Sequence, residues 1–298
     1  MDIRALFMGL AFAFMWSSAF TSARIIVADA PPLTALAIRF LISGLIGVGI
    51  ALALGQTWRL TRGQWRATVV FGICQNALYL GLNFVAMQTI EASLAAIIAS
   101  TLPLLVALVS WLVFRETLRP LGVAGLVAGF AGVALIMGSR LSGGVDIYGV
   151  VLCVLGVLAL TLATMSVRGA SSGGNVLMIV GLQMLIGSAV LSAVAVSTEE
   201  WSVTWSWQLG AAFAYTTLVP GLAATVVWFM LVNRIGATRA ATFHFLNPFF
   251  GVAIAALLLG ERLGPLDLIG VGIVMFGILA VQLSRQRPAA RPVPQPSE

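Results

Sequence analysis

The stretch RETLRPL at residues 115–121 returns as GERLGPL at residues 260–266. Around these two stretches, residues 100–140 align without a gap on residues 245–285, and ten of the 41 aligned pairs are identical. Leucines and glycines coincide easily in apolar sequence, whereas two prolines and a glutamate in register do not. The chain therefore contains an internal repeat with an offset of 145 residues. The pairs that fix the register are Pro103 with Pro248, Glu116 with Glu261, and Pro120 with Pro265.

The composition places both copies of the repeat in a membrane. Of the 298 residues, 60% are hydrophobic and only 9% are charged, whereas a soluble domain carries about 25% charged residues. An apolar run of about 20 residues spans the bilayer core as a helix, and ten such runs follow one another. The sequence predicts an all-α integral membrane protein with ten transmembrane helices. The expected spans are residues 5–24, 33–54, 67–87, 92–114, 121–138, 147–167, 176–196, 207–231, 238–259 and 266–283.

The repeat also predicts in which sense the helices of each half cross the membrane. Its offset covers five helices, an odd number, so the second copy must cross the membrane in the opposite sense to the first. Inverted repeats are the architecture of many secondary transporters, in which the halves move against each other around a site at mid-membrane. We expect one five-helix unit over residues 1–140 and an inverted unit over residues 141–284. The remaining residues 285–298, rich in proline and arginine, are expected to form a disordered cytoplasmic tail.

The arginines predict the orientation. All 16 basic residues are arginine, and twelve of them flank one side of the membrane if both termini lie in the cytoplasm. Because positively charged loops tend to stay in the cytoplasm, this arrangement predicts cytoplasmic termini. The net charge of +6 therefore reflects membrane topology, and no nucleic-acid partner is expected.

The distribution of reactive side chains argues against an enzyme. The chain has one histidine and two cysteines, and its ten acidic residues all fall at expected loops or helix ends. No nucleophile with an acid or base, and no metal-ligand set, can be assembled, so we expect neither catalysis nor a metal or cofactor. The lack of a carboxylate at mid-membrane favours facilitated diffusion over carboxylate-coupled proton antiport.

The ten helices, the proline in the fourth helix of each half, the RETLRPL and GERLGPL turns and the glycine-rich last helices resemble the EamA-type members of the drug/metabolite transporter superfamily. The resemblance covers residues 1–284 and is greatest to the YddG-type exporters of aromatic and other amino acids. It implies export of amino acids across the bacterial inner membrane. The inverted repeat predicts alternating access as the mechanism, and a monomer is the expected assembly. It also implies a central cavity lined by helices one, three, four, six, eight and nine.

The third helix carries the strongest candidate binding residues. Gln75, Asn76, Tyr79 and Asn83 fall within an arc of about 100° on an ideal helix. Such groups do not face lipid, where an unpaired polar group is costly. They line a water-filled cavity or bond to a neighbouring helix. The other helices that the resemblance assigns to the cavity offer Trp16, Ser17, Phe20, Thr164, Tyr215 and Trp228 as further substrate-binding candidates, each of which could instead be a core residue.

The segment FHFLNPFF, residues 243–250, contains the single histidine. Pro248 and its counterpart Pro103 are expected to kink the fourth helix of each half and to act in gating. His244 and Asn247 have no counterpart in the first half, and we interpret them as substrate-binding candidates. For His244 two interpretations stay open: a buried neutral side chain bonded to a neighbour, or a ligand-binding or proton-sensitive group.

Three further features are expected to be structural or to lie near the membrane surface, although Arg39 also has a functional interpretation. Arg39 could extend its side chain to the membrane surface or pair with a substrate carboxylate. Gly125 and Gly129 have the spacing of a close helix contact, and Glu116 and Glu261 are expected to cap or pair locally.

An apolar, aromatic pocket with a few polar groups suits an amphipathic metabolite. Amino acids with aromatic or apolar side chains are the favoured substrates. The alternatives are other small amphipathic metabolites or drugs, with possible proton coupling through His244.

Overall fold

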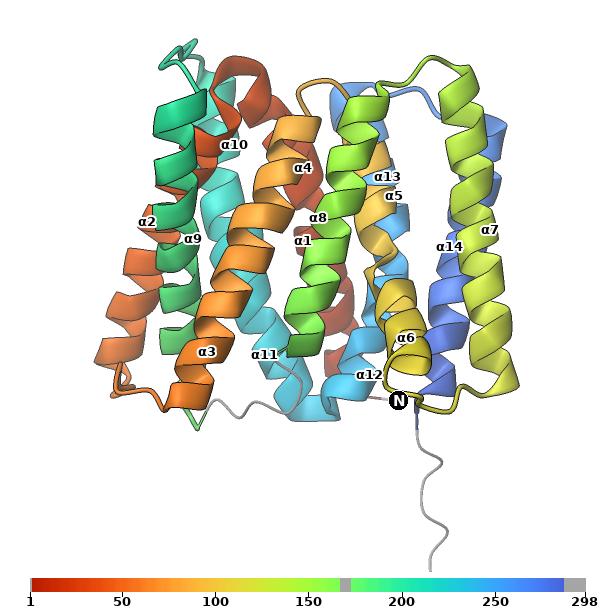
Figure 1. Ribbon diagram of the computed structural model, residues 1–298, viewed down its shortest axis with the longest axis horizontal. Helices are drawn as coiled ribbons and strands as arrows, with labels where there is room; N and C mark the ends of the chain where they lie inside the picture. The colour runs from red at the N-terminus through yellow and green to blue at the C-terminus, as the bar shows by residue number, and fades with distance from the viewer. Residues whose placement is uncertain (1, 167–172, 287–298) are drawn as a thin grey trace, which may run out of the picture.

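The computed structural model describes residues 2–166 and 173–286. Within these ranges ten helices are long and apolar enough to cross a membrane, which confirms the expected number (Figure 1). Residues 287–298 of the expected tail and Arg168 lie outside the described residues.

The first five spans are built from eight helical segments. Prolines open several of them because the first residues of a helix need no N–H partner, as Pro32 and Pro120 show. The α1 helix is longer than expected, so Arg24 lies inside it and donates hydrogen bonds to the carbonyl oxygens of Met87 and Gln88. The segments are α1 (Ile3–Asp29), α2 (Pro32–Ala53), α3 (Arg62–Phe71), η1 (Gly72–Tyr79), α4 (Leu80–Ala86), α5 (Ala92–Ser100), α6 (Leu102–Leu112) and α7 (Pro120–Ser142).

The second five spans repeat this plan. Pro265 opens the last helix, as Pro120 does in the first half. The segments are α8 (Ile147–Ser166), α9 (Val176–Thr198), α10 (Trp207–Leu218), η2 (Val219–Ala223), α11 (Ala224–Ile235), α12 (Ala237–Thr242), η3 (Phe243–Leu246), α13 (Asn247–Leu259) and α14 (Pro265–Ser284).

The fourth span of each half is interrupted just before its proline. The break between α5 and α6 falls at Thr101, two residues before Pro103, and the 3₁₀ segment η3 ends two residues before Pro248. Proline lacks the N–H that would continue the helical hydrogen bonds, so the preceding turn changes its pitch. The interruption expected at both prolines is present.

The third span of each half contains a π-helical segment, which was not expected from the sequence. The η1 segment and the η2 segment occupy equivalent places under the offset of 145 residues. A π-helix has more residues per turn than an α-helix, so the arc calculated for an ideal α-helix does not apply. Asn76 instead faces α9, where a Cβ on Gly187 would lie 2.4 Å from the Asn76 Cβ. Asn76 therefore packs against α9 and is not in the cavity lining with Gln75, Tyr79 and Asn83, although its Oδ1 lies 3.5 Å from Nε2 of Gln75.

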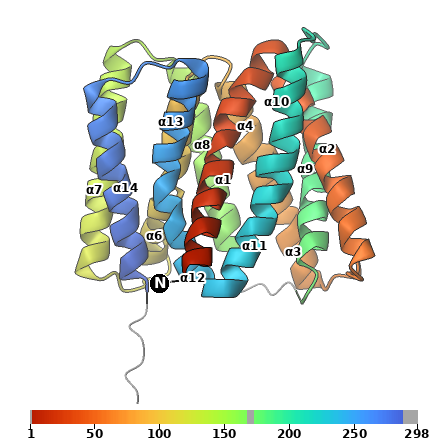
Figure 2. The ribbon, with the colours of Figure 1, turned by 180° about the vertical axis from the view of Figure 1, so that it is seen from behind.

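Two pairs of helices make the most extensive contacts, α7 with α14 and α2 with α9 (Figures 1 and 2). Glycines let their backbones approach closely: a Cβ on Gly277 would lie 2.5 Å from the backbone nitrogen of Gly129, and one on Gly181 would lie 2.8 Å from that of Val48. The close contact expected at Gly125 and Gly129 is confirmed. Between these pairs, α1 contacts α10, α11 and α13 of the second half.

We predict that Gly277→Ala lowers the free energy of unfolding by about 1–3 kcal/mol, because the added methyl group forces two backbones apart. Thermal unfolding in detergent micelles measures the change. The control is Gly272→Ala on the same helix, where an added Cβ has no neighbour within 4 Å. Equal melting temperatures for the two variants would contradict this packing.

Candidate functional site

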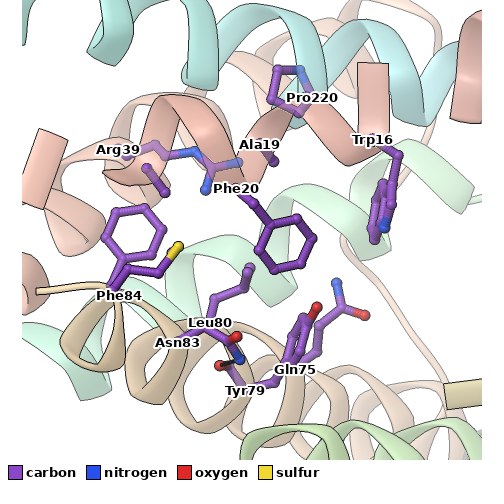
Figure 3. Close-up of a pocket in the computed structure, with 12 residues that line it drawn as sticks. Trp16, Ala19, Phe20, Arg39, Gln75, Tyr79, Leu80, Asn83, Phe84 and Pro220 are labelled. Atoms are coloured by element: carbon purple, nitrogen blue, oxygen red, sulfur yellow. Dashed lines mark hydrogen bonds between the residues drawn. The ribbon is translucent and has the colours of Figure 1, made fainter. Parts of the chain in front are cut away.

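Two small cavities lie between the two halves of the chain. The first, which we call the arginine cavity, is shown in Figure 3 and is formed by α1, α2, η1, α4 and η2. Gln75 and Tyr79 face Phe20 across it, and the Arg39 guanidinium extends past Ala19 towards its interior. Its lining residues are Trp16, Ala19, Phe20, Ala23, Arg39, Gln75, Tyr79, Leu80, Asn83, Phe84, Met87 and Pro220.

The second cavity, the histidine cavity, shares Trp16, Phe20 and Tyr79 with the first. These three aromatic side chains therefore separate the two cavities. Both helix breaks before the prolines reach it, since Pro103 and Asn247 are among its lining residues. The full lining is Trp16, Phe20, Tyr79, Ala99, Ser100, Leu102, Pro103, Leu160, His244 and Asn247.

The cavities are small in this conformation. Their volumes are about 50 Å³ and about 40 Å³, and a single water needs roughly 10–15 Å³ by the same kind of measure. Each therefore has room for a few waters and not for a solute of the size of an amino acid.

His244 and Asn247 interact directly. The Asn247 amide nitrogen lies 3.0 Å from Nδ1 of His244, which leaves Oδ1 of Asn247 buried without a partner. The Ser17 hydroxyl donates to the Asn247 carbonyl oxygen at 3.2 Å and so ties α1 to α13. Asn247 thus offers an unused acceptor beside the histidine cavity.

An aromatic cluster formed by Phe12, Trp16, Trp228 and His244 lies on the side of the cavities nearer the N-terminus. The Phe12 ring centroid is 5.7 Å from that of Trp16, 4.7 Å from that of Trp228 and 5.3 Å from that of His244. Phe12 is 3% exposed. The cluster joins α1 of the first half to α11 and η3 of the second.

The remaining binding candidates lie against neighbouring helices and not in the lining of either cavity. The Tyr215 hydroxyl is 2.8 Å from the Ser18 hydroxyl, which joins α10 to α1. Thr164 donates to the carbonyl oxygen of Leu160 within its own helix. Ser17, Asn76 and Trp228 make the contacts given above, so for these five side chains the structure records interhelical or local bonding.

Asn83 has both roles that the sequence left open. It lines the arginine cavity, but its amide nitrogen donates to the Tyr79 carbonyl oxygen at 2.8 Å and its oxygen accepts from the Cys153 thiol at 3.3 Å. The Asn83 amide therefore forms hydrogen bonds that connect η1, α4 and α8.

Comparison with known proteins identifies the family. The model of the EamA-like transporter family matches twice, over residues 3–138 and 147–283. The chain belongs to the EamA-like transporter family. The expected family is thereby confirmed, and the likeness to amino-acid exporters in particular stays a prediction.

Relatives of this EamA-family transporter align along most of its length. It is 28% identical to the transporter YvbV of Bacillus subtilis, over 90% of this chain and 88% of YvbV. It is 27% identical to the inner membrane transporter YedA of Escherichia coli K12, over 95% of this chain and 92% of YedA. A crystal structure 19% identical in sequence superimposes with a TM-score of 0.69 over 96% of this chain and all of the other, which shows the same fold.

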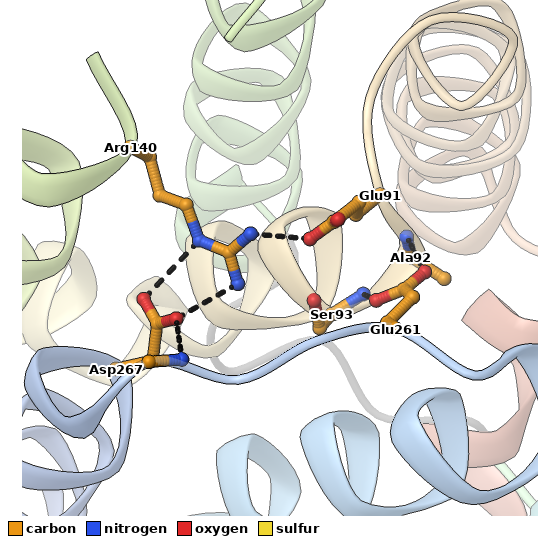
Figure 4. Close-up of polar contacts among 7 residues, drawn as sticks. Glu91, Ala92, Ser93, Arg140, Glu261 and Asp267 are labelled. Carbon is orange, nitrogen blue, oxygen red and sulfur yellow. Dashed lines mark hydrogen bonds and ion pairs between the residues drawn. The ribbon is translucent and has the colours of Figure 1, made fainter. Parts of the chain in front are cut away.

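At the end of the transporter opposite the N-terminus, a charged network joins the two halves (Figure 4). Arg140 at the end of α7 forms ion pairs with Glu91 and with Asp267 at the start of α14. Its Nε donates to Asp267 Oδ1 at 3.1 Å, and its Nη2 lies 3.0 Å from Oδ2 outside good hydrogen-bond alignment. Asp267 is 3% exposed, and its Oδ2 also accepts a hydrogen bond from the Gly264 backbone nitrogen at 2.9 Å.

Two further carboxylates at this end cap helices of the other half. Glu261 accepts hydrogen bonds from the backbone nitrogens of Ala92 and Ser93, at 2.7 Å and 3.0 Å. Glu199 does the same for Leu33 and Thr34 at the start of α2. A carboxylate at a helix N-terminus satisfies N–H groups that have no intrahelical partner. The expectation that Glu261 caps a helix is therefore correct, but the partner is 169 residues away and not local.

The N-terminal end is held by a smaller contact. Asp2 pairs with Arg234 at the end of α11, with 2.5 Å between Oδ2 and Nε. The hydrogen bond from the Arg234 guanidinium lowers the pKa of Asp2 below its usual value. Both groups are largely open to solvent, so this pair stabilises closure at that end only weakly.

Phe12, Phe84 and the partners of Arg140 were not among the residues expected from the sequence. Phe12 could have been found from its position one helical turn before Trp16 on the same face. Glu91, Arg140 and Asp267 come from three separate loops or helix ends, and no sequence spacing predicts that they meet.

We predict that Arg140→Gln lowers the free energy of unfolding by about 3 kcal/mol, because it leaves the buried Asp267 carboxylate without a counter-ion. Combining Arg140→Gln with Asp267→Asn should cost less than the sum of the two single changes. Unfolding of the four proteins in detergent gives this double-mutant cycle, and strictly additive losses would show that the pair is not coupled.

Proposed function

We propose that this EamA-family transporter exports amino acids, with aromatic and apolar side chains favoured. The observation that carries the proposal is the chemistry of the two cavities. Their walls are aromatic and aliphatic, their polar groups are neutral except for one arginine, and none of the described lining residues is acidic. Such a site suits a solute with an apolar body and a compact polar end.

The two cavities offer complementary partners for a zwitterion. Arg39 in the arginine cavity can neutralise a carboxylate. The buried oxygen of Asn247 beside the histidine cavity has no donor and can accept from an ammonium group. The three aromatic residues between them, Trp16, Phe20 and Tyr79, would contact the side chain of the bound amino acid.

The transport cycle that we propose is alternating access between two inverted five-helix repeats, residues 1–140 and 141–284. Arg140, Glu91 and Asp267 would hold one end shut while the aromatic cluster around Phe12 closes the other. Because the cavities hold only a few waters, a solute can enter only when one of these closures opens. The interrupted helices before Pro103 and Pro248 are where that bending would concentrate.

The arginine distribution favours cytoplasmic termini. With this orientation, the Arg140 network closes the external side and the aromatic cluster closes the cytoplasmic side. We propose a location in the bacterial inner membrane and function as a monomer, since the cavities are formed within one chain.

Export would proceed by facilitated diffusion, because the described cavity lining has no carboxylate to carry a proton. A second candidate is proton-coupled export of other small amphipathic metabolites or drugs. It is favoured by His244, which lines a cavity beside the aromatic cluster. Protonation of its imidazole during the cycle would couple proton movement to export of the solute.

The proposed function predicts that reconstituted vesicles take up labelled phenylalanine down its gradient, and that excess unlabelled phenylalanine on the far side drives counterflow. Uptake should persist when the pH gradient is abolished. Loss of uptake on abolishing only that gradient would favour the proton-coupled alternative, and absence of uptake for every amino acid would reject amino-acid export.

We further predict that His244→Ala and Asn247→Ala change the KM for export or its pH dependence, because both side chains line the histidine cavity. Pro248→Ala should chiefly change the maximal rate or the melting temperature, since it allows the helix to continue through the break. Vesicle uptake measured between pH 5.5 and 8.0 tests all three, and unchanged kinetics in all three would contradict these assignments.

A further inference from the structure

Arg39 is a charged side chain inside the membrane without a charged partner. It lies eight residues into α2 and is 5% exposed, so its side chain does not reach the surface as one interpretation of the sequence expected. No carboxylate among the described residues forms an ion pair with it, and its Nε has no hydrogen-bond acceptor. By contrast, Arg140 at the membrane edge has two carboxylates.

An unpaired guanidinium in this position is costly. A guanidinium remains protonated at every physiological pH, and a buried charge is normally paired. The Arg39 guanidinium makes a cation–π contact with the ring of the adjacent Phe40, whose centroid lies 5.1 Å from Arg39 Cζ. A cation–π contact of this kind compensates only part of the lost hydration. The fold therefore retains an expensive charge that no described internal contact explains.

The surroundings of Arg39 leave space for an anion. It lines the arginine cavity together with Phe20 and Phe84 (Figure 3). On its other side, η2 approaches closely: a Cβ on Gly221 would lie 3.5 Å from Arg39 Nη2. Ser43, one helical turn further along α2, has a buried hydroxyl without a hydrogen-bond partner. That hydroxyl would lie 3.6 Å from the same Cβ. A guanidinium and a hydroxyl without a recorded partner thus both lie near Gly221, where α2 contacts η2.

We propose that Arg39 binds the carboxylate of the transported solute and makes a carboxylate the required feature of the substrate. This inference rests on the proposed function as a transporter and specifies which end of the solute is recognised. Two parallel N–H groups of a guanidinium match the two oxygens of a carboxylate. The bound pair is electrically neutral, so the ion pair lowers the cost of holding either charge within the membrane.

The proposal separates three solutes that share an aromatic ring. Phenylalanine and 3-phenylpropionate carry a carboxylate and should both bind. Phenethylamine carries only an ammonium group, which the Arg39 guanidinium repels and which no described lining carboxylate can attract. The ammonium of phenylalanine is therefore less important than its carboxylate.

The variants test the assignment. Arg39→Gln should weaken phenylalanine counterflow and 3-phenylpropionate binding by roughly 30-fold or more, because a carboxylate would lose its buried counter-ion. Arg39→Lys keeps the charge without the two parallel donors and should restore part of the affinity. Arg66→Gln on the exposed surface of α3 removes the same charge outside the cavity and is the matched control.

A stability measurement distinguishes binding from a structural role. Arg39 has no ion-pair partner in the described chain, so Arg39→Met should leave the melting temperature in detergent unchanged or raise it. Lost transport with an unchanged melting temperature supports carboxylate binding. A large drop in melting temperature for Arg39→Met would show that the arginine supports the fold, and would overturn the proposal.

The experiment has two arms so that each hypothesis can fail separately. In vesicles, phenylalanine counterflow is measured with 3-phenylpropionate and phenethylamine as competitors. In detergent, calorimetry measures binding of 3-phenylpropionate to the unmodified protein and to Arg39→Gln. Counterflow retained in Arg39→Gln, or equal competition by phenethylamine, overturns the role of Arg39 while amino-acid export stands.

If the unmodified protein transports no amino acid, the calorimetric arm decides. Binding of 3-phenylpropionate that is lost in Arg39→Gln supports the carboxylate site and rejects only the amino-acid assignment. If 3-phenylpropionate does not bind to the unmodified protein either, both amino-acid export and the carboxylate site at Arg39 are overturned.

Discussion

The hydrocarbon core of a bilayer offers no hydrogen-bond partner to a peptide group or a charge, and the rest of this structure depends on that constraint. It requires continuous helices wherever the chain faces lipid. It allows a helix to be broken only where neighbouring protein or enclosed water can satisfy the freed groups. The described interruptions at Thr101, η1, η2 and η3 obey this rule, because each borders one of the two cavities or a neighbouring helix.

The two halves are held together by two different means. Along the sides, glycines of α7 and α14 bring the backbones into contact, which gives dispersion energy over a long surface without any charge. At the end opposite the N-terminus, Arg140 and Glu261 connect the halves through ion pairs and helix caps. The glycine contact depends on close packing along the whole length of the helices, whereas the ionic contacts are confined to one end of the bundle. This difference suits a molecule in which some interfaces stay fixed and others open.

The cavities have an unequal distribution of charge. Acidic side chains are kept at the ends of the bundle, where each one that the structure pairs has arginine, hydroxyl or backbone N–H partners. The membrane interior holds Arg39 without such a partner. A site with one cation and aromatic walls has a net attraction for anions.

Sequence alone determined the architecture of this protein. Hydrophobic run length fixed ten helices, since a helix must match the thickness of the bilayer, and the recurrence of a proline and a glutamate at an offset of 145 residues exposed the repeat. The family resemblance pointed to Trp16 and Phe20, the polar residues of the third helix included Tyr79, and the single histidine was His244; all four line a cavity.

Only the tertiary structure decided which polar groups face the cavities. Asn76, in the π-helical segment η1, packs against Gly187 of α9, a contact that depends on how the two helices meet. The isolation of Arg39 and the pairing of Arg140 were equally hidden, because an ion pair depends on the distance between side chains from different helices. That distance is set by how the helices pack in three dimensions and not by their spacing along the chain.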